Sequence, residues 1–337
     1  MNKIVTGLLG FGMGGRVFHG PLLSGDGGFT LKSVSGRSFL ESAKDYPGTI
    51  NQTVDEILDD SEIELVVITT PNGTHGPLVQ KALEAGKHVV VDKPFCLSFL
   101  QARGLVDFAK DRKLKLTIFQ NRRWDGDFLT AKKLIQDGTL GSLVSFESNY
   151  HRFRTLIRNS WKESQDEGGG ILWDLGPHLV DQAVQLFGIP HSWSMDKRTT
   201  RPGALTPDDF EIFLNYGAEK RIVLRAAMVR AYPDPRFVLH GLEGSWVKTG
   251  MDPQENDLKS GRKIQDPGWG LDVSGTQGML YRSTPQGVQG SALVGVPGAY
   301  PNFYRQMYHS LRTGQEVPVD PESVLPVLRI LEDLSRE

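Results

Sequence analysis

Residues 4–15 read Ile-Val-Thr-Gly-Leu-Leu-Gly-Phe-Gly-Met-Gly-Gly, an apolar run that ends in the pattern Gly-x-Gly-x-x-Gly. The run predicts a buried strand, and glycines in this pattern between a strand and a helix are typical of a dinucleotide-binding turn. Gly10 allows the tight turn, Gly12 lets a pyrophosphate approach the backbone, and Gly15 lets helix and strand pack closely. A plain glycine turn is the alternative, but the position at the first strand–helix junction favours a dinucleotide. With Phe11, these three glycines are the first candidates for binding a cofactor.

The first 120 residues alternate between strand-like and helix-like patterns. Strand-like runs occur at 4–9, 29–35, 64–70, 88–91 and 114–119. Thr53 with Glu56, and Ser98 with Gln101, fit capping boxes that begin helices. Alternation of this kind predicts a doubly wound parallel sheet, with helices on both faces and ligands at the carboxyl ends of its strands.

From about residue 143 the pattern changes to strand followed by strand. Alternating apolar and polar residues predict two antiparallel hairpins, at 210–216 with 222–228 and at 237–240 with 245–248. Helices are expected at 127–137, 170–187, 302–313 and 321–335, and long loops in the Gly- and Pro-rich stretch 250–300. The predicted class is therefore α/β. A Rossmann domain at 1–120 is followed by an α/β domain at 121–337 with an open, mostly antiparallel sheet, and its last helices are candidates to pack back on the first domain.

The composition is that of an ordinary globular protein. The 337 residues, enough for about two domains, carry 38 Lys and Arg against 40 Asp and Glu. A net charge of −2 argues against binding nucleic acid through a basic face. No stretch approaches the roughly 18 apolar residues of a membrane span, and glycines interrupt the apolar N-terminal run that a signal peptide needs. The single Cys96 excludes an internal disulfide and a multi-Cys zinc module, so we expect a cytoplasmic protein.

The tip of the second strand indicates which dinucleotide is bound. It reads Ser35-Gly36-Arg37-Ser38, with no acidic residue before Glu41. NAD-specific sites usually place Asp or Glu there to bind the ribose 2′-hydroxyl. Arg37 can instead stack on adenine and pair with a 2′-phosphate, to which Ser35 and Ser38 can donate. A solvated loop arginine is the alternative. We expect NADP as the cofactor, with NAD as the weaker candidate.

A second motif, Thr69-Thr70-Pro71-Asn72-Gly73-Thr74-His75, begins where the strand at 64–70 ends. At the ligand edge of the sheet, Asn72 and His75 can face the cofactor. A simple turn in which Thr74 caps the next helix explains the same residues equally well. Thr70, Pro71, Asn72 and His75 are cofactor-binding candidates.

A third motif, Asp92-Lys93-Pro94, ends the strand at 88–91. A lysine there, partly desolvated beside a nicotinamide cation, would have a lowered pKa and could exchange a proton with a substrate hydroxyl. The alternative is a surface lysine before a turn proline. Asp92 and Lys93 join the cofactor-binding candidates, and Lys93 is also a catalytic candidate.

The most unusual stretch surrounds Asp174 and His178. These two residues are four apart and Asp181 is three further, so all three share one face of the predicted helix. Gly176 and Pro177 are costly inside a helix, and a purely structural helix has little reason to keep both. A metal site lacks a third strong donor nearby, so no metal is expected. An acid/base pair, with His178 protonating and Asp174 orienting, fits better than a capping Asp and a core His.

In this order the motifs resemble the Gfo/Idh/MocA oxidoreductase family over essentially the whole chain. The motifs that carry the resemblance are Gly10 to Gly15, Thr70-Pro71-Asn72 with His75, Asp92-Lys93-Pro94, Asn121-Arg122-Arg123-Trp124 and Gly168–His178. Within the family, the stretches 90–95, 121–125, 152–154 and 174–178 look most like bacterial NADP-dependent scyllo-inositol 2-dehydrogenases. One departure is Asp92, where the wider family usually has Glu, so the carboxylate has a shorter reach toward Lys93.

The resemblance implies that Lys93, Asp174 and His178 line the reaction site and that the Lys93–Pro94 bond is cis. The expected reaction is reversible oxidation of a secondary alcohol on a cyclic polyol or sugar, with His178 or Lys93 taking the hydroxyl proton. Asp174 would bind a substrate hydroxyl or fix the imidazole. Further candidates for the substrate pocket are Asn121, Arg123, Tyr150, Arg152, Arg154 and Trp161.

The resemblance also implies a homo-oligomer, a dimer or tetramer, formed through the open sheet of the second domain. Two other functions stay open at this point. One is a catalytically silent regulator that senses the dinucleotide, although such a protein would usually lose Lys93 or the Asp174/His178 pair. The other is the same chemistry on an aldose, a ketose or an anhydro sugar.

Overall fold

The computed structural model describes residues 2–25, 27–36, 38–39, 43–165, 168–218, 220–232, 234–273 and 278–336. It divides into two compact units. Unit 1 comprises Met1–Asn121, Gln254–Trp269 and Tyr300–Arg329, and unit 2 comprises Arg122–Pro253, Gly270–Ala299 and Ile330–Glu337.

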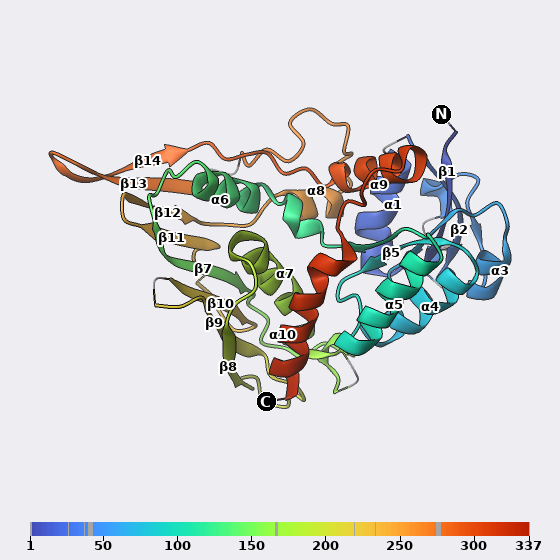
Figure 1. The fold of residues 1–337 in the computed structure, drawn as a ribbon, viewed down its shortest axis with the longest axis horizontal. Helices are drawn as coiled ribbons and strands as arrows, with labels where there is room; N and C mark the ends of the chain where they lie inside the picture. Colours follow the sequence, from blue (N-terminus) through green and yellow to red (C-terminus); the bar gives the residue numbers. More distant parts are fainter. Residues whose placement is uncertain are drawn as a thin grey trace. The chain divides into compact units, whose positions relative to one another are not determined.

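Unit 1 contains a six-stranded parallel sheet in the order β3-β2-β1-β4-β5-β6 (Figure 1). Its strands are β1 Ile4–Leu9, β2 Phe29–Ser35, β3 Ile50–Asn51, β4 Leu65–Ile68, β5 His88–Asp92 and β6 Leu116–Phe119. This is the strand order of a Rossmann fold, in which β2 and β3 lie on one side of β1 and β4, β5 and β6 lie on the other. The five predicted strands are confirmed. Only β3 was missed, because its two exposed residues leave no apolar run to detect.

The helices of unit 1 begin with a wide, π-type turn at Gly14–His19 that continues into α1 Gly20–Gly25. The others are α3 Val54–Asp59, α4 His75–Glu84, α5 Phe99–Asp111, α8 Gln254–Lys259 and α9 Pro301–Thr313. α10, Leu325–Arg336, crosses the boundary between the units. The capping box at Thr53 is confirmed, since the Thr53 and Glu56 side chains each accept from the other residue's backbone N–H. At Ser98 the side chain accepts from the Gln101 N–H.

Unit 2 is built on an eight-stranded sheet in the order β14-β13-β12-β11-β7-β10-β9-β8. Its strands are β7 Leu143–His151, β8 Ser192–Arg198, β9 Asp209–Asn215, β10 Arg221–Ala227, β11 Phe237–Gly241, β12 Gly244–Lys248, β13 Gly278–Thr284 and β14 Gly287–Leu293. Every neighbouring pair is antiparallel except β7 with β10. Both predicted hairpins, and the mostly antiparallel sheet, are confirmed.

The expectation of long loops throughout 250–300 was wrong in part, because α8, β13 and β14 lie there. β14 is exposed along almost its whole length, so it has no buried face and shows no apolar alternation. β14 pairs with β13 through backbone hydrogen bonds, which a glycine-containing sequence can make without a recognisable side-chain pattern.

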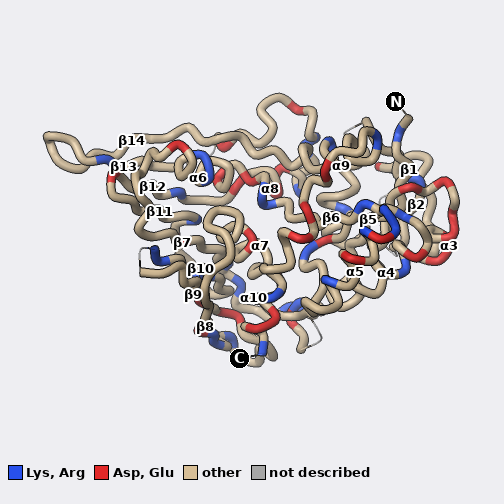
Figure 2. Tube along the Cα trace, in the orientation of Figure 1, with Lys and Arg blue, Asp and Glu red and all other residues tan. Residues whose placement is uncertain are grey.

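One face of the unit 2 sheet is covered by α6 Gly126–Gln136 and α7 Gly170–Phe187 (Figure 1). Along β9 the alternate residues Phe210, Ile212 and Leu214 are buried, whereas Phe213, which points to the other face, is 40% exposed. The uncovered face is hollowed around Trp193 and Phe213. Acidic and basic residues are interspersed in both units (Figure 2). No described helix is both long and apolar enough to cross a membrane.

The core of unit 1 contains a buried histidine. His19 is fully buried, and its Nδ1 lies 2.6 Å from the hydroxyl of Tyr304 on α9. Phe119 packs against His19 with ring centroids 4.2 Å apart. Burial lowers the pKa of the His19 imidazole to about 4, against the opposing effect of Asp92. The ring is therefore held neutral in the folded chain.

His19 is expected to make stability fall on acidification. The unfolded chain takes up the proton near its ordinary pKa of about 6.5, and the folded chain only near 4, so this contribution is complete above pH 6.5 and is lost as the pH falls toward 4. His19 contributes about 3 kcal/mol at most to the free energy of unfolding in this way. Tm measured between pH 7.5 and 4.5 should fall less steeply for His19→Gln than for the wild type. His309→Gln, at an exposed position, should keep the wild-type slope, and parallel curves for all three proteins would contradict the assignment.

Candidate functional site

The carboxyl edge of the parallel sheet gathers the motifs of unit 1. Gly10 follows β1, Ser35 ends β2, Thr70 follows β4, Asp92 ends β5, and Asn121 follows β6. Because all six strands are parallel, these positions lie along one edge. The sheet therefore brings together residues that are spread over more than a hundred positions of sequence.

The glycine loop has the geometry of a phosphate cradle. Gly10 has a φ of +94°, and its N–H donates to the Ser35 carbonyl at 2.8 Å. A Cβ at Gly15 would lie 2.4 Å from the Gly10 carbonyl oxygen, so only glycine fits there. A Cβ at Gly12 would meet no protein atom within 4 Å, which leaves the backbone open on that side. The Thr69 hydroxyl donates to the Gly10 carbonyl at 2.7 Å and holds the loop to the end of β4. A pyrophosphate fits such a loop.

Phe11 takes part in the loop through its backbone. Its side chain is buried and packs edge-on against Phe39 and Tyr46, with ring centroids 5.2 and 5.6 Å apart. The Ser38 hydroxyl donates to the Phe11 carbonyl at 2.7 Å, which ties the tip of β2 to the glycine loop. Arg37 lies outside the described residues, so its pairing with a 2′-phosphate stays a prediction.

His75 holds two loops together. The ring is buried, with Nε2 2.8 Å from the Thr70 carbonyl oxygen and Nδ1 2.7 Å from that of Pro94. A neutral imidazole has one N–H and donates to one of these oxygens at a time. Burial lowers the pKa of this imidazole, and the hydrogen bond to Pro94 opposes that effect. Thr74 stands at the N-cap of α4 without a side-chain cap bond. The turn before α4 contains Thr70, Pro71 and Asn72, the last of them buried.

The Lys93–Pro94 peptide bond is cis, as the resemblance implied. The Asp92 carboxylate accepts from the Lys93 backbone N–H at 3.1 Å. A Cβ at Gly14 would lie 2.8 Å from Asp92 Oδ2, so the glycine loop passes close to this carboxylate. Asp92 and Lys93 are therefore at the same edge as the phosphate cradle.

In unit 2, Asp174 and His178 lie one turn apart on α7 and are both buried. The Asp174 carboxylate accepts from Arg152 at 2.8 Å and from Lys162 at 2.7 Å, one cation for each oxygen. Two cations stabilise its ionised form. Lys162 was not predicted, although it adjoins the candidate Trp161, over whose ring its Nζ lies 5.6 Å from the centroid.

The other residues of α7 that the sequence singled out have structural roles. Asp181 is buried and binds Arg123 through two hydrogen bonds of 2.9 and 2.6 Å. A Cβ at Gly176 would lie 2.8 Å from Leu331 Cδ2, so glycine allows the close approach of that side chain. Pro177 has no N–H and cannot donate to the preceding turn of the helix. Arg123 was predicted to line the substrate pocket, and its guanidinium binds Asp181.

A cavity of about 70 Å³ lies beside the first turn of α7. Asp174 lines it together with Arg152, Arg154 and Lys162, so it contains three of the residues predicted for the substrate and one that was missed. The lining also includes Arg201, which binds Glu163 at 2.6 Å. No sequence pattern indicated Arg201, because it comes from a loop some forty residues away from Lys162.

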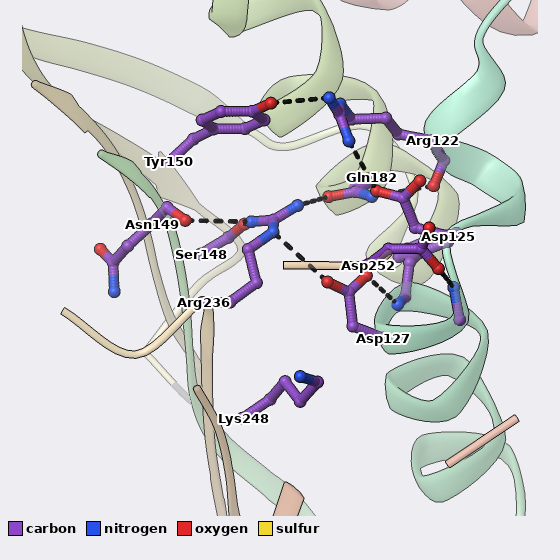
Figure 3. Close-up of polar contacts among 12 residues, drawn as sticks. Arg122, Asp125, Asp127, Ser148, Asn149, Tyr150, Gln182, Arg236, Lys248 and Asp252 are labelled. Atoms are coloured by element: carbon purple, nitrogen blue, oxygen red, sulfur yellow. Dashed lines mark hydrogen bonds and ion pairs between the residues drawn. The ribbon is translucent and has the colours of Figure 1, made fainter. Parts of the chain in front are cut away.

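Tyr150 connects this region to a buried polar network (Figure 3). Its hydroxyl accepts from Arg122 at 2.6 Å, and Arg122 also donates to Asp125 at 3.1 Å. The guanidinium carbons of Arg122, Arg152 and Arg236 lie 4.9, 5.4 and 5.7 Å from the Tyr150 ring centroid. The phenol ring therefore stands among three cations that attract its π-face.

Arg236 forms the centre of the buried network (Figure 3). It is 2% exposed and donates to Ser148 of β7 at 2.6 Å and to Gln182 of α7 at 2.7 Å. The Asp127 carboxylate of α6 lies 3.8 Å from its Nε. Burial lowers the pKa of the guanidinium, and Asp127 opposes that effect. Arg236 thus links the sheet to both helices that cover it.

Two models of one oxidoreductase family match the chain. Residues 4–120 match its NAD-binding Rossmann fold, and residues 132–336 match its C-terminal alpha/beta domain. The chain belongs to the Gfo/Idh/MocA oxidoreductase family.

Relatives within this family span nearly the whole chain. The uncharacterized oxidoreductase YdgJ of Escherichia coli is 41% identical over 98% of this chain and 95% of that protein. The scyllo-inositol 2-dehydrogenase (NADP(+)) IolW of Bacillus subtilis is 35% identical over 98% of this chain and 93% of that protein. The solved structure of yvaA from Bacillus subtilis superposes with a TM-score of 0.95, at 34% identity, over 99% of this chain and 96% of that one.

The described residues of this chain do not form a cluster of metal ligands. Across the part of the chain that the structure describes, no three His, Cys, Asp or Glu side chains are grouped to hold a metal ion.

Replacing Gly15 should weaken dinucleotide binding. In Gly15→Ala the new Cβ would lie 2.4 Å from a backbone oxygen of the cradle, so the loop must shift. We expect the Kd for NADPH, measured by fluorescence titration, to rise about tenfold or more. Gly104→Ala, on α5 with no atom within 4 Å of the new Cβ, is the matched control and should bind NADPH as the wild type does. Equal affinities for all three proteins would show that the loop does not bind the dinucleotide.

Replacing Arg236 should destabilise the protein strongly. Arg236→Met leaves Asp127, Gln182 and Ser148 buried without this partner, and breaking a buried pair in this way typically costs about 3–5 kcal/mol. The Tm from thermal unfolding should fall by several degrees. Arg198→Met removes an exposed ion pair with Asp196 and should change Tm by little. Similar effects of the two substitutions would argue against a central role for the Arg236 network.

Proposed function

We propose that the chain is an NADP-dependent oxidoreductase that acts on a secondary alcohol of a cyclic polyol or sugar. The observation that carries the proposal is the carboxyl edge of the parallel sheet. There the glycine loop, open at Gly12, lies beside the Asp92-Lys93-Pro94 turn with its cis bond. The name of the relative IolW, a scyllo-inositol 2-dehydrogenase (NADP(+)), supports a cyclic polyol as the substrate.

The preference for NADP rests on the tip of β2. The residues after this strand are Gly36, Arg37 and Ser38, and none is acidic. A ribose 2′-phosphate next to a carboxylate would be repelled, whereas hydroxyls and a guanidinium would bind it. The NADP named in the relative IolW agrees with this preference.

When bound, NADP supplies the hydride acceptor or donor of the reaction. Lys93 and His178 are the candidates to hold the proton that the substrate hydroxyl gains or loses. The Asp174 carboxylate, stabilised by Arg152 and Lys162, can accept a hydrogen bond from a substrate hydroxyl. Holding the alcohol in one orientation by such contacts is the main contribution of the protein to the rate.

Self-association through the uncovered face of the unit 2 sheet is part of the proposal. This face exposes Val144 and Phe213, at 44% and 40%, around the hollow beside Trp193. Apolar surface of this kind on a sheet is suited to pair with a second copy.

The function is tested by the change in absorbance at 340 nm with NADP and a panel of cyclitols, aldoses, ketoses and anhydro sugars. NADPH should form with at least one cyclic polyol or sugar, and kcat/KM should be higher with NADP than with NAD. Turnover on no member of the panel, combined with tight NADPH binding, would favour the dinucleotide-sensing regulator instead. Higher kcat/KM with NAD would contradict the cofactor preference.

His178→Ala should lower kcat by about a hundredfold or more and leave the Kd for NADPH unchanged. The imidazole is needed for proton transfer and has no part in the glycine loop. His309→Ala, at an exposed position on α9, is the matched control and should keep wild-type turnover. If His178→Ala turns over substrate at the wild-type rate, His178 has no part in the mechanism.

A further inference from the structure

The cavity beside α7 carries an excess of positive charge. Five cationic side chains line it: Arg152, Arg154, Arg158, Lys162 and Arg201. The acidic residues of the described lining are three: Glu163, Asp174 and Asp208. The described lining therefore has two more cations than carboxylates.

The three carboxylates are already engaged by three of the cations. Arg201 is buried and binds Glu163 at 2.6 Å and Asp208 at 2.7 Å. Asp174 binds Arg152 at 2.8 Å and Lys162 at 2.7 Å. Among the described lining residues, these pairs leave the charges of Arg154 and Arg158 without a carboxylate partner.

Arg154 and Arg158 have no ion pair with a carboxylate of the described chain. Arg154 is half-buried and Arg158 is exposed. Burial, followed by the positive charges of Arg152 and Arg158, lowers the pKa of the Arg154 guanidinium. These positive charges repel one another, and a bound anion would reduce that repulsion.

Hydroxyl groups of a neutral ligand would accept hydrogen bonds from these guanidiniums but would leave both charges uncompensated. A carboxylate or a phosphate would compensate them and offers the two-pronged geometry that arginine prefers. The cavity, at about 70 Å³, has room for a few water molecules and so for one such oxyanion group. Asp174, a candidate for binding the reacting alcohol, lines the same space.

We propose that this cavity receives an anionic group, a carboxylate or a phosphate, of the substrate, so that the chain acts on acidic sugars or cyclitols. The inference rests on the proposed function and narrows its substrate class. Arg154 and Arg158 bind the anionic group, and Arg152 and Lys162 hold Asp174 for the alcohol.

The test uses ligands that keep the ring and change one group. Glucose, galactose and mannose are each compared with their uronate and their 6-phosphate in the presence of NADP. Both binding, by isothermal titration calorimetry, and kcat/KM, at 340 nm, are measured. At least one acidic series should bind about ten- to a hundredfold more tightly than its neutral parent, the range expected for hydrogen bonds to charged groups. Which series gains identifies the group as carboxylate or phosphate.

The variant Arg154→Gln/Arg158→Gln should bring the acidic-to-neutral affinity ratio close to one. Arg158→Lys, which keeps the charge, should keep most of the ratio. Arg282→Gln, an exposed arginine of β13 outside the cavity, is the matched control and should keep the wild-type ratio. Raising the salt concentration should lower the ratio of the wild type, because the Debye length shrinks.

The two proposals fail in different ways. If scyllo-inositol or the neutral sugars are turned over and the acidic ones bind no better, the anionic substrate is ruled out and the proposed function stands. If the acidic ligands bind better but the double variant keeps their advantage, this cavity is not their site and the inference is overturned. If no ligand of the panel is turned over with NADP or NAD, the proposed function fails, and with it the substrate class.

Discussion

The contact between Gly15 and the carbonyl oxygen of Gly10 constrains the whole first unit. It lets the helical segment after β1 begin against the strand itself, where any larger residue would collide with the backbone. The cradle that results is held from both sides, by Ser38 of the β2 tip and Thr69 of the β4 end. β1 lies in the middle of the sheet, so the glycine loop that follows it is held at the same edge as Asp92 and Lys93.

Much of this architecture can be read from the sequence because its patterns are local. Strands β1 and β2, helix α7 and the capping box at Thr53 each depend on residues a few positions apart. The parallel sheet then follows, since strands that alternate with helices have few other ways to pack. A strand such as β14, without a buried face, offers no such local signal.

The site was harder to predict because its side chains depend on long-range contacts. A glycine pattern indicates where a backbone turns, but not that the Phe11 side chain points into the core. For His75, the sequence left a ligand role and a plain turn open, and the structure adds a contact of each ring nitrogen with a backbone carbonyl. Lys162, from the short 3-10 helix Trp161–Glu163, and Arg201, from a loop, line the same cavity as Asp174, and no spacing in the sequence indicates this. The spacing of apolar residues predicts helices and strands well. Ion pairs between segments far apart in the sequence depend on how the whole chain folds.

The parallel pairing of β7 with β10, the exception in its sheet, has a consequence for how this fold diversifies. A parallel pair requires a crossover, and here the crossover contains the loops around Trp161, helix α7 and the strands β8 and β9. The excursion carries Asp174, His178 and most of the charged cavity, while the two strands that it joins stay in register. The loops and the helix of this single excursion can therefore change in length or charge without disturbing the pairing of β7 with β10, and a new ligand preference can arise in one continuous segment of the gene.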